Sequence, residues 1–223
     1  MPLAASTPIV CCVTDRRNIP GSAAEDPLSA LRNCIRAAGE AGADWVQIRE
    51  KDLSGRELLS VARNAVALAR VRVIVNDRAD VALAAGAAGV HLGAASAPLR
   101  EMVRWVRESS APVEFLVGIS CHSAEEVCRA ESGGAGYAFF GPVFHTPSKR
   151  AFGEPQGIPR LEAACRAARI PVIAIGGISE ANAEDCIRAG ASGIAAIRMF
   201  QDSKDAAGLA KAVARIHAIR RGG

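Results

Sequence analysis

Short apolar runs alternate with longer amphipathic stretches along this chain. Four short runs rich in branched or apolar residues are followed by polar loops and amphipathic stretches, and we predict them to be strands: Ile9–Thr14, Arg72–Asn76, Leu116–Ser120 and Val172–Ile175. Four further runs each follow a phrase of small residues that contains glycine: Trp45–Arg49, Gly89–Leu92, Tyr137–Gly141 and Gly193–Ile197. Glycine permits the left-handed turn that ends a helix, so each phrase is predicted to close a helix and open a strand.

The four phrases recur at roughly the length of two strand–helix units, which predicts eight such units. The amphipathic stretches between the runs are predicted helices: Leu28–Ala41, Gly55–Arg70, Asp80–Ala85, Leu99–Glu108, Ala124–Ser132, Pro159–Ala168, Glu180–Ala189 and Lys204–Arg220. Ser123 and Ser179 are the expected N-caps of two of them. Strict alternation of strands and helices, with strands that are fully apolar, indicates that the strands pair in parallel. We therefore predict one domain over residues 1–223, a compact (β/α)8 TIM barrel, with an open doubly wound sheet as the alternative.

Composition narrows the function classes. A formal charge of +4 is too mild and too dispersed for a nucleic-acid surface, and an aromatic content of 4% offers no stacking platform for single strands. No apolar stretch is long enough to span a membrane, and no basic segment with an apolar core opens the chain, so we expect a cytoplasmic protein. The seven cysteines form no CxxC pair, which disfavours a disulfide framework or a zinc site. For Cys121 alone, two interpretations stay open: a reactive thiol in a loop at the mouth, or a core residue that only packs.

In a barrel of this kind, residues at the carboxyl ends of the strands meet at one mouth. Gln47, Arg49 and Lys51 alternate along one strand end and are predicted to form a wall of donors suited to phosphate or pyrophosphate. Asp77, directly after Asn76, is a candidate Mg²⁺ ligand, since Mg²⁺ takes one or two carboxylates together with phosphate oxygens. The alternative for Asp77 is an ion pair with a neighbouring arginine, Arg49 or Arg78.

A second anion site is predicted where Gly176 and Gly177 follow a strand and precede a helix, with Arg198 adding a positive charge from the end of the last strand. Two anion sites suggest two phosphorylated substrates. The segment 143–157 is long and carries hydroxyl and cationic side chains, which predicts a flexible loop that covers the substrate. Lys149 is its best candidate for a role in the site.

Six ordered motifs resemble the thiamine phosphate synthase family: Gln47-Ile-Arg49-Glu-Lys51, Asn76-Asp77-Arg78, Gly89-Val-His91-Leu-Gly93, Gly141-Pro-Val-Phe, Thr146-Pro-Ser148-Lys149 and Ala174-Ile-Gly176-Gly177-Ile178. The resemblance runs from about Val13 to Ile197. It implies a transferase that joins a hydroxymethylpyrimidine diphosphate to a thiazole phosphate with Mg²⁺ and releases pyrophosphate. It also implies small-molecule partners, with neither nucleic acid nor membrane, and leaves a homo-oligomer open.

The resemblance assigns site residues by position. The pyrimidine diphosphate is expected to contact Gln47, Arg49, Lys51, Asn76 and Lys149, with Asp77 on the metal. The thiazole phosphate is expected to contact Thr146, Ser148, Gly177 and the end of the last strand at Ile197 and Arg198. The expected catalytic residues are Lys149, Ser120, Asn76 and His122.

The chain departs from the family pattern at two places. Ala94-Ala95-Ser96 stands where the family has Gln-x-Asp, a second metal ligand, so Ser96 is the candidate that remains for this place. Arg198 stands where the family has a serine near the thiazole phosphate. A related thiazole tautomerase lacks the metal aspartate and resembles this chain around Gly118–Ser123, with His122 as acid and base. The tautomerase and a non-catalytic regulatory protein that binds thiazole phosphate are the alternatives.

Overall fold

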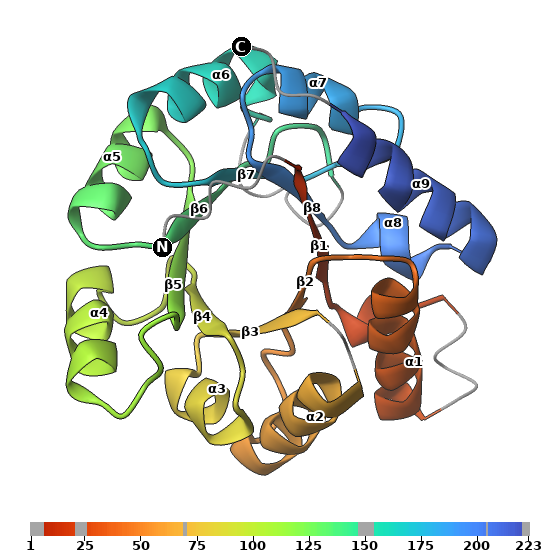
Figure 1. Ribbon diagram of the computed structural model, residues 1–223, viewed down its shortest axis with the longest axis vertical. Coiled ribbons are helices and arrows are strands. Elements are labelled where there is room, and N and C mark those ends of the chain that lie inside the picture. Colours follow the sequence, from red (N-terminus) through yellow and green to blue (C-terminus); the bar gives the residue numbers. More distant parts are fainter. Residues whose placement is uncertain (1–6, 21–25, 69–70, 147–153, 204, 220–223) are drawn as a thin grey trace.

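The eight predicted strands close into one parallel barrel in chain order (Figure 1). The computed structural model describes residues 7–20, 26–68, 71–146, 154–203 and 205–219. The strands are β1 (Ile9–Val13), β2 (Trp45–Ile48), β3 (Arg72–Asn76), β4 (Gly89–Leu92), β5 (Leu116–Cys121), β6 (Tyr137–Phe140), β7 (Val172–Ile175) and β8 (Gly193–Ala196). The last strand pairs with the first in the register Ile9↔Gly193, which closes the barrel and excludes the open sheet.

The helices form a ring around the barrel (Figure 1). Their bounds are η1 (Arg16–Asn18), α1 (Pro27–Glu40), α2 (Gly55–Leu68), α3 (Ala79–Ala85), α4 (Leu99–Glu108), α5 (Ala124–Ser132), α6 (Gly157–Ala167), α7 (Ala183–Arg188), α8 (Arg198–Gln201) and α9 (Ala206–Ala218). The short elements η1 and α8 were not predicted, because neither is long enough to show a helical period. No helix in the described part of the chain is long and apolar enough to cross a membrane.

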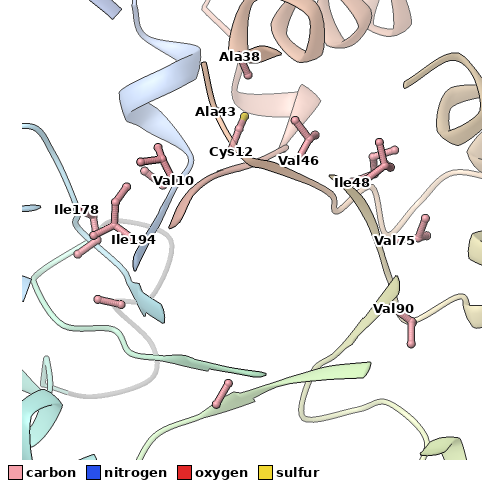
Figure 2. Close-up of a cluster of buried hydrophobic side chains, with 14 of the residues drawn as sticks. Val10, Cys12, Ala38, Ala43, Val46, Ile48, Val75, Val90, Ile178 and Ile194 are labelled. Carbon is pink, nitrogen blue, oxygen red and sulfur yellow. The ribbon is translucent and has the colours of Figure 1, made fainter. Parts of the chain in front are cut away.

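Alternation along each strand divides the apolar side chains into two layers. Outward residues such as Val10, Val46 and Ile194 pack against the helices, and Figure 2 shows them pointing away from the barrel. Inward residues fill the barrel itself: Ile9, Cys11, Val13, Trp45, Ile74, Tyr137, Phe139, Ile173 and Ala195. The interior is therefore packed below the mouth, and only the carboxyl ends of the strands are left to form a site.

Glycine has two uses in closing this barrel. Each of the four small-residue phrases contains a glycine with positive φ, as predicted: Gly42, Gly86, Gly134 and Gly190. Gly193 serves a different purpose, because a Cβ built there would lie 2.2 Å from the carbonyl oxygen of Ile9. The strand that closes the barrel can approach β1 this closely only without a side chain at that position.

Candidate active site at the barrel mouth

A chain of polar side chains crosses the mouth from β2 to the loop after β4. The Gln47 amide is buried and donates through Nε2 to Asn76 Oδ1 at 3.0 Å. Asn76 Nδ2 then donates to Asp77 Oδ2 at 2.5 Å. The Ser96 hydroxyl donates to the other carboxylate oxygen, Asp77 Oδ1, and accepts from the backbone N–H of Gly93 at 2.6 Å. Four of the predicted site residues are thus joined in one network.

The backbone at Asp77 is held in an unusual conformation. Asp77 has φ 63°, the only positive φ of a non-glycine residue among those described. Its own N–H donates to the carbonyl of His91 at 2.9 Å, and the Arg78 N–H donates to the carbonyl of Asn76 at 2.8 Å, which forms a three-residue turn. Such strain collects at functional sites, because the surrounding structure must hold it in place. Here the turn directs the carboxylate toward Ser96.

The ion-pair alternative for Asp77 is not what the structure contains. Arg78 forms its ion pair with Asp80, at 2.6 Å, and this contact lowers the pKa of Asp80. Asp77 instead accepts from a hydroxyl and an amide. Its side chain is half-buried and faces Ser96, so two oxygen atoms of the kind that Mg²⁺ prefers lie together.

This oxygen set fits a Mg²⁺ ion that arrives with a phosphorylated substrate. No cluster of three or more His, Cys, Asp or Glu side chains is found among the residues that the structure describes. Asp77 and Ser96, the two predicted ligands, bring their oxygen atoms together at this place. Mg²⁺ commonly accepts one or two carboxylates and completes its shell with water and substrate phosphate oxygens.

A buried histidine links the interior aromatic residues to the mouth. His91 Nδ1 lies 3.1 Å from the Tyr137 hydroxyl, and Nε2 lies 3.0 Å from Ser120 Oγ. Burial, with the nearby charge of Arg49, lowers the pKa of His91 to about 3. A neutral imidazole has one donor and one acceptor, which suits a hydroxyl at each end. His91 thus holds Ser120 in place. The sequence gave no sign of the contact between His91 and Tyr137.

His122 and Cys121 lie side by side in sequence but face different surroundings. The exposed His122 ring donates through Nδ1 to the carbonyl of Gly141, and its backbone N–H donates to Glu126 Oε2 at 2.6 Å. Cys121 points outward into the layer beneath the helices, and burial raises the pKa of its thiol to about 12. Of the two possibilities left open for Cys121, packing is the one the structure supports.

The predicted second anion site lies where β7 turns toward α7. Gly176 has φ 97° and Gly177 has φ 68°. A Cβ at Gly177 would lie 2.6 Å from the carbonyl oxygen of His145, so this turn is pressed against the segment after β6. Two backbone bonds hold that segment in place: Val143 N–H to the Ile175 carbonyl and Phe144 N–H to the Gly176 carbonyl, both at 2.9 Å.

Several expectations at this second site need correction or lie outside the described residues. Ser179 is not a helix N-cap, because α7 begins at Ala183 and Asn182 intervenes: its side chain accepts from the Ser179 N–H and donates to the Gly177 carbonyl. Ser123, in contrast, caps α5 by accepting from the Glu126 N–H, as predicted. Thr146 is half-buried at the edge of the loop. Ser148 and Lys149 lie outside the described residues.

The end of β8 also differs from expectation. The strand ends at Ala196, and Ile197 is half-buried at the mouth side of the interior cluster. Arg198 is not the last residue of the strand: it begins the short helix α8, and its side chain is exposed.

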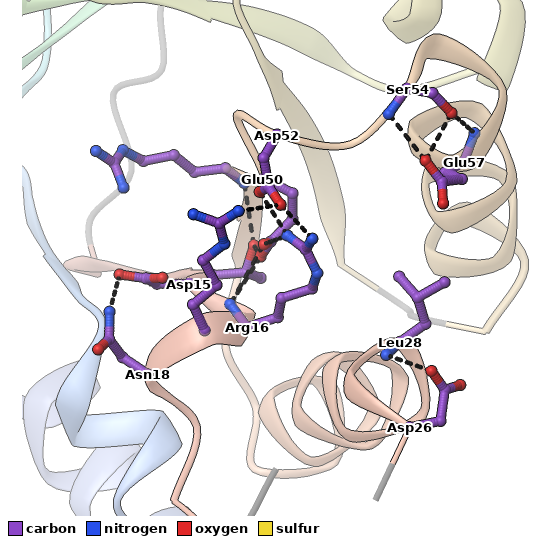
Figure 3. A network of polar contacts seen from close by, with 12 residues as sticks. Asp15, Arg16, Asn18, Asp26, Leu28, Glu50, Asp52, Ser54 and Glu57 are labelled. Carbon is purple, nitrogen blue, oxygen red and sulfur yellow. Dashed lines mark hydrogen bonds and ion pairs between the residues drawn. The ribbon is translucent and has the colours of Figure 1, made fainter. Parts of the chain in front are cut away.

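The cationic wall after β2 is backed by an ion-pair network that the sequence did not reveal. Arg49 is half-buried and Lys51 exposed. Glu50, between them, is buried and bonds to Thr14 and Arg16 (Figure 3). Arg16 also contacts Asp52 through both terminal nitrogens, which lowers the pKa of Asp52. The unpredicted η1 turn carries Arg16 to this position.

Comparison with known proteins agrees with this geometry. The family model described as thiamine monophosphate synthase matches residues 10–200. A thiamine-phosphate synthase of Roseiflexus sp. is 39% identical over 214 residues, covering 95% of this chain and 84% of the relative. One from Methanoculleus marisnigri is 42% identical over 181 residues, covering 80% and 83%.

Solved structures lead to the same family. A thiamine phosphate pyrophosphorylase from Pyrococcus furiosus superimposes with a TM-score of 0.80 at 30% identity, covering 96% of each chain. The likeness therefore extends over the whole barrel as well as the motifs at its mouth. The chain belongs to the thiamine monophosphate synthase family, and it is a transferase.

Proposed function

We propose that this protein joins 4-amino-5-hydroxymethyl-2-methylpyrimidine diphosphate to hydroxyethylthiazole phosphate in the cytoplasm, with Mg²⁺, and releases pyrophosphate. The observation that carries the proposal is the hydrogen-bonded row of Gln47, Asn76, Asp77 and Ser96 across the mouth. This row supports a metal site at Asp77 next to a cationic strand end, the arrangement that a diphosphate leaving group requires. Family membership supplies the reaction class.

The pyrimidine diphosphate is proposed to bind against β2 and β3. Arg49 and Lys51 face the phosphoryl oxygens, and Gln47 and Asn76 orient them through their amides. Asp77, with Ser96, would hold the metal, whose charge stabilises the departing pyrophosphate. Lys149 is assigned to the same diphosphate from the resemblance of its loop. Because the hydrogen-bonded row from Gln47 to Ser96 is formed without substrate, its groups would stabilise developing charge with little reorganisation.

The bond between the pyrimidine methylene carbon and the diphosphate oxygen breaks, and the thiazole nitrogen forms the new bond to that carbon. Positive charge develops on the pyrimidine as the pyrophosphate leaves with the electron pair. Ser120, held by the neutral His91, is proposed to contact the reacting pyrimidine. The thiazole phosphate is placed at Gly177, Thr146, Ser148 and the Ile197–Arg198 turn. No side chain of the protein needs to act as a nucleophile.

The decisive experiment measures pyrophosphate release from both substrates with and without Mg²⁺. We expect release to require both substrates and Mg²⁺. Asp77→Asn should lower kcat/KM by on the order of 100-fold or more, since a lost metal contact removes several kcal/mol of transition-state stabilisation. Asparagine tolerates positive φ, so this variant keeps the turn while it removes the charge. Asp80→Asn is the matched control, because it removes a neighbouring acid that pairs with Arg78.

Absence of release at every Mg²⁺ concentration would exclude the synthase and leave a thiazole tautomerase as the second candidate. The observation that favours this candidate is His122, exposed near the mouth with one ring nitrogen held by the Gly141 carbonyl. The tautomerase activity is measured as isomerisation of a thiazole carboxylate phosphate, and His122→Gln should abolish this activity. If neither activity is found, binding of thiazole phosphate alone distinguishes the regulatory alternative.

A further inference from the structure

We propose that Glu50 is a positioning residue for the diphosphate site: with Thr14 and Arg16 it fixes the end of β2 so that Arg49 and Lys51 face the bound diphosphate. The inference rests on the function proposed above and deepens it. Neither Thr14 nor Arg16 belongs to the residues expected to contact substrate. The argument comes from strand alternation, hydrogen bonding and charge around one buried carboxylate.

Strand alternation gives Glu50 a different direction from its neighbours. Trp45 points into the barrel, and Val46 and Ile48 point outward. Continuing this alternation, Gln47 and Arg49 lie on the inner side and Glu50 on the outer side. The influence of the Arg49 charge on the buried His91 agrees with an inward arginine. Glu50 therefore acts from behind the wall that its neighbours form.

The Glu50 carboxylate is almost fully buried, with a residue exposure of 5%, and it is well supplied with donors. Oε1 accepts from the Thr14 hydroxyl at 2.7 Å and from the Arg16 backbone N–H at 3.1 Å. Oε2 accepts from the Arg16 guanidinium at 2.9 Å. Figure 3 shows Arg16 joined by dashed lines to both Glu50 and Asp52. A buried charge supplied in this way is costly to disturb, because losing one partner leaves the other unpaired.

The Thr14 hydroxyl transmits this arrangement to the backbone of the site. The ladder between β1 and β2 ends with Val13 beside Gln47. Beyond it, the Thr14 N–H donates to the Gln47 carbonyl at 2.9 Å, and Thr14 Oγ1 accepts from the Arg49 N–H at 3.0 Å. Because the hydroxyl gives its proton to Glu50, its lone pair is available to the Arg49 amide. The position of Arg49 is thus set by Glu50 through one hydroxyl.

Neighbouring positive charges allow the acidic Glu50 to lie between Arg49 and Lys51 in the sequence. The carboxylate pairs with Arg16, which also bonds to Asp52 at 2.5 and 2.7 Å, and Arg17 adds a second positive charge at Asp52. Within the described part of the chain, the ion pairs do not engage Arg49 or Lys51. Their charge therefore remains available for an anion, while the negative charge between them is compensated on the outer side.

The test uses inorganic pyrophosphate with Mg²⁺ as the probe, measured by titration calorimetry, together with KM for both substrates. Glu50→Gln keeps the shape but loses one acceptor and the charge. We expect pyrophosphate binding and KM for the pyrimidine diphosphate to worsen by about 10-fold to 100-fold, the range in which small displacements of positioned groups act. KM for the thiazole phosphate should not change. A general loss of folding would not separate the two substrates in this way.

One further pair of variants and a control keep the proposal falsifiable if Glu50→Gln folds poorly. Thr14→Val removes the hydroxyl and should weaken pyrophosphate binding, whereas Thr14→Ser keeps it and should restore binding. Asp44→Asn is the matched control: Asp44 also joins β1 to β2, accepting from the Val10 N–H at 2.8 Å, but at the opposite end of the strands. It should leave pyrophosphate binding unchanged. Equal affinity in wild type, Glu50→Gln and Thr14→Val would overturn the inference while the proposed function stands.

Amide hydrogen exchange of the peptide around Arg49 separates the inference from the proposed function. We expect faster exchange, with or without ligand, in Thr14→Val, where the Arg49 amide loses its acceptor, and in Glu50→Gln, where the accepting Thr14 hydroxyl is no longer held by a carboxylate. If the wild type neither binds pyrophosphate nor turns over substrate, the proposed function fails. The role of Glu50 in fixing this strand end is then supported by faster exchange in the variants and refuted by unchanged exchange.

Discussion

At the scale of single residues, the mouth depends on polar groups whose protonation is set by burial. His91 is 2% exposed, between two hydroxyl groups, and the pKa of Tyr137 is raised well above its usual value by burial. Both groups therefore stay neutral over the range in which an enzyme works. This gives Ser120 a fixed hydrogen-bond partner without adding positive charge where a carbocation is proposed to form.

The buried His91 predicts a distinct loss of stability in mild acid. Its pKa is about 3 in the folded protein against 6.5 for an ordinary histidine. Between these values the unfolded chain binds more protons, so the free energy of unfolding falls as pH is lowered through this window, by up to about 1.4 kcal/mol per pH unit. Urea unfolding of wild type and His91→Gln between pH 7 and pH 5 measures this contribution.

We expect the slope below about pH 6 to be shallower in His91→Gln than in the wild type, whatever the variant's absolute stability. His145→Gln serves as control, because the His145 side chain is 84% exposed and should leave the wild-type slope intact. Parallel profiles for wild type and His91→Gln would contradict a buried, neutral His91.

At the scale of elements, the pairing of β5 with β6 positions the side chains that hold Ser120 in place. Gly118 lies beside Tyr137 in the register, and a Cβ at Gly118 would stand 2.0 Å from the Tyr137 ring. The ring therefore occupies the space that a side chain on β5 would need. Since the hydroxyl of that ring bonds to His91, the absence of a side chain at Gly118 indirectly sets the geometry of Ser120.

Gly118→Ala should destabilise the barrel by about 3 kcal/mol or more, at the upper end of overpacking penalties, because neither the strand nor the buried ring can move freely. It should also reduce kcat by displacing His91. Gly93→Ala offers the comparison, since the nearest atom to its Cβ would be Ser96 Oγ at 3.9 Å. Chemical denaturation and pyrophosphate release of both variants test this, and equal stabilities would refute the close contact.

The elements themselves were largely predictable because each apolar run is bounded by polar residues or a glycine turn. β3, β4, β7, α4 and α5 have the predicted bounds. The start of α7 was misplaced, because Ser179 has the composition of an N-cap while Asn182 makes the local hydrogen bonds instead. Serine and asparagine have similar N-cap propensities. Propensity therefore does not decide between Ser179 and Asn182, which are three positions apart.

The site was predictable where it depends on the ends of strands and less so where it depends on tertiary contacts. Alternation along β2 and the Asn76-Asp77 pair were enough to predict Gln47, Asn76 and Asp77 at the mouth, but not the hydrogen bonds that join them to one another and to Ser96. The partners Tyr137, Thr14 and Arg16 were not predictable, because each contacts the site from an element distant in sequence. For the same reason Asp77 was open to an arginine partner until its contact with Ser96 was visible.

At the scale of the whole molecule, the two halves of the barrel are joined at the closure and through the interior. β8 pairs with β1, and Asp44 accepts from both the Val10 N–H and His217 Nε2, which fastens α9 to the start of the barrel. Across the interior, the ring of Trp45 on β2 meets that of Tyr137 on β6, with centroids 4.9 Å apart at 72°. The proposed diphosphate contacts on β2 and β3 belong to the first half and the thiazole phosphate site to the second, from which Ser120 and Lys149 are also proposed to contact the pyrimidine substrate.

This arrangement predicts that the barrel unfolds as one unit, since neither half can keep its interior covered without the other. Of the two tryptophans, Trp45 is buried and Trp105 is 45% exposed on α4, so Trp105→Phe leaves Trp45 as the only tryptophan. Its fluorescence then follows the contact with Tyr137 across the interior, while far-UV circular dichroism follows the helices of both halves. We expect the two signals to change at the same urea concentration. Loss of the Trp45 signal ahead of the helical signal would mean that the halves separate first, and that the two substrate sites are not held together by a single cooperative fold.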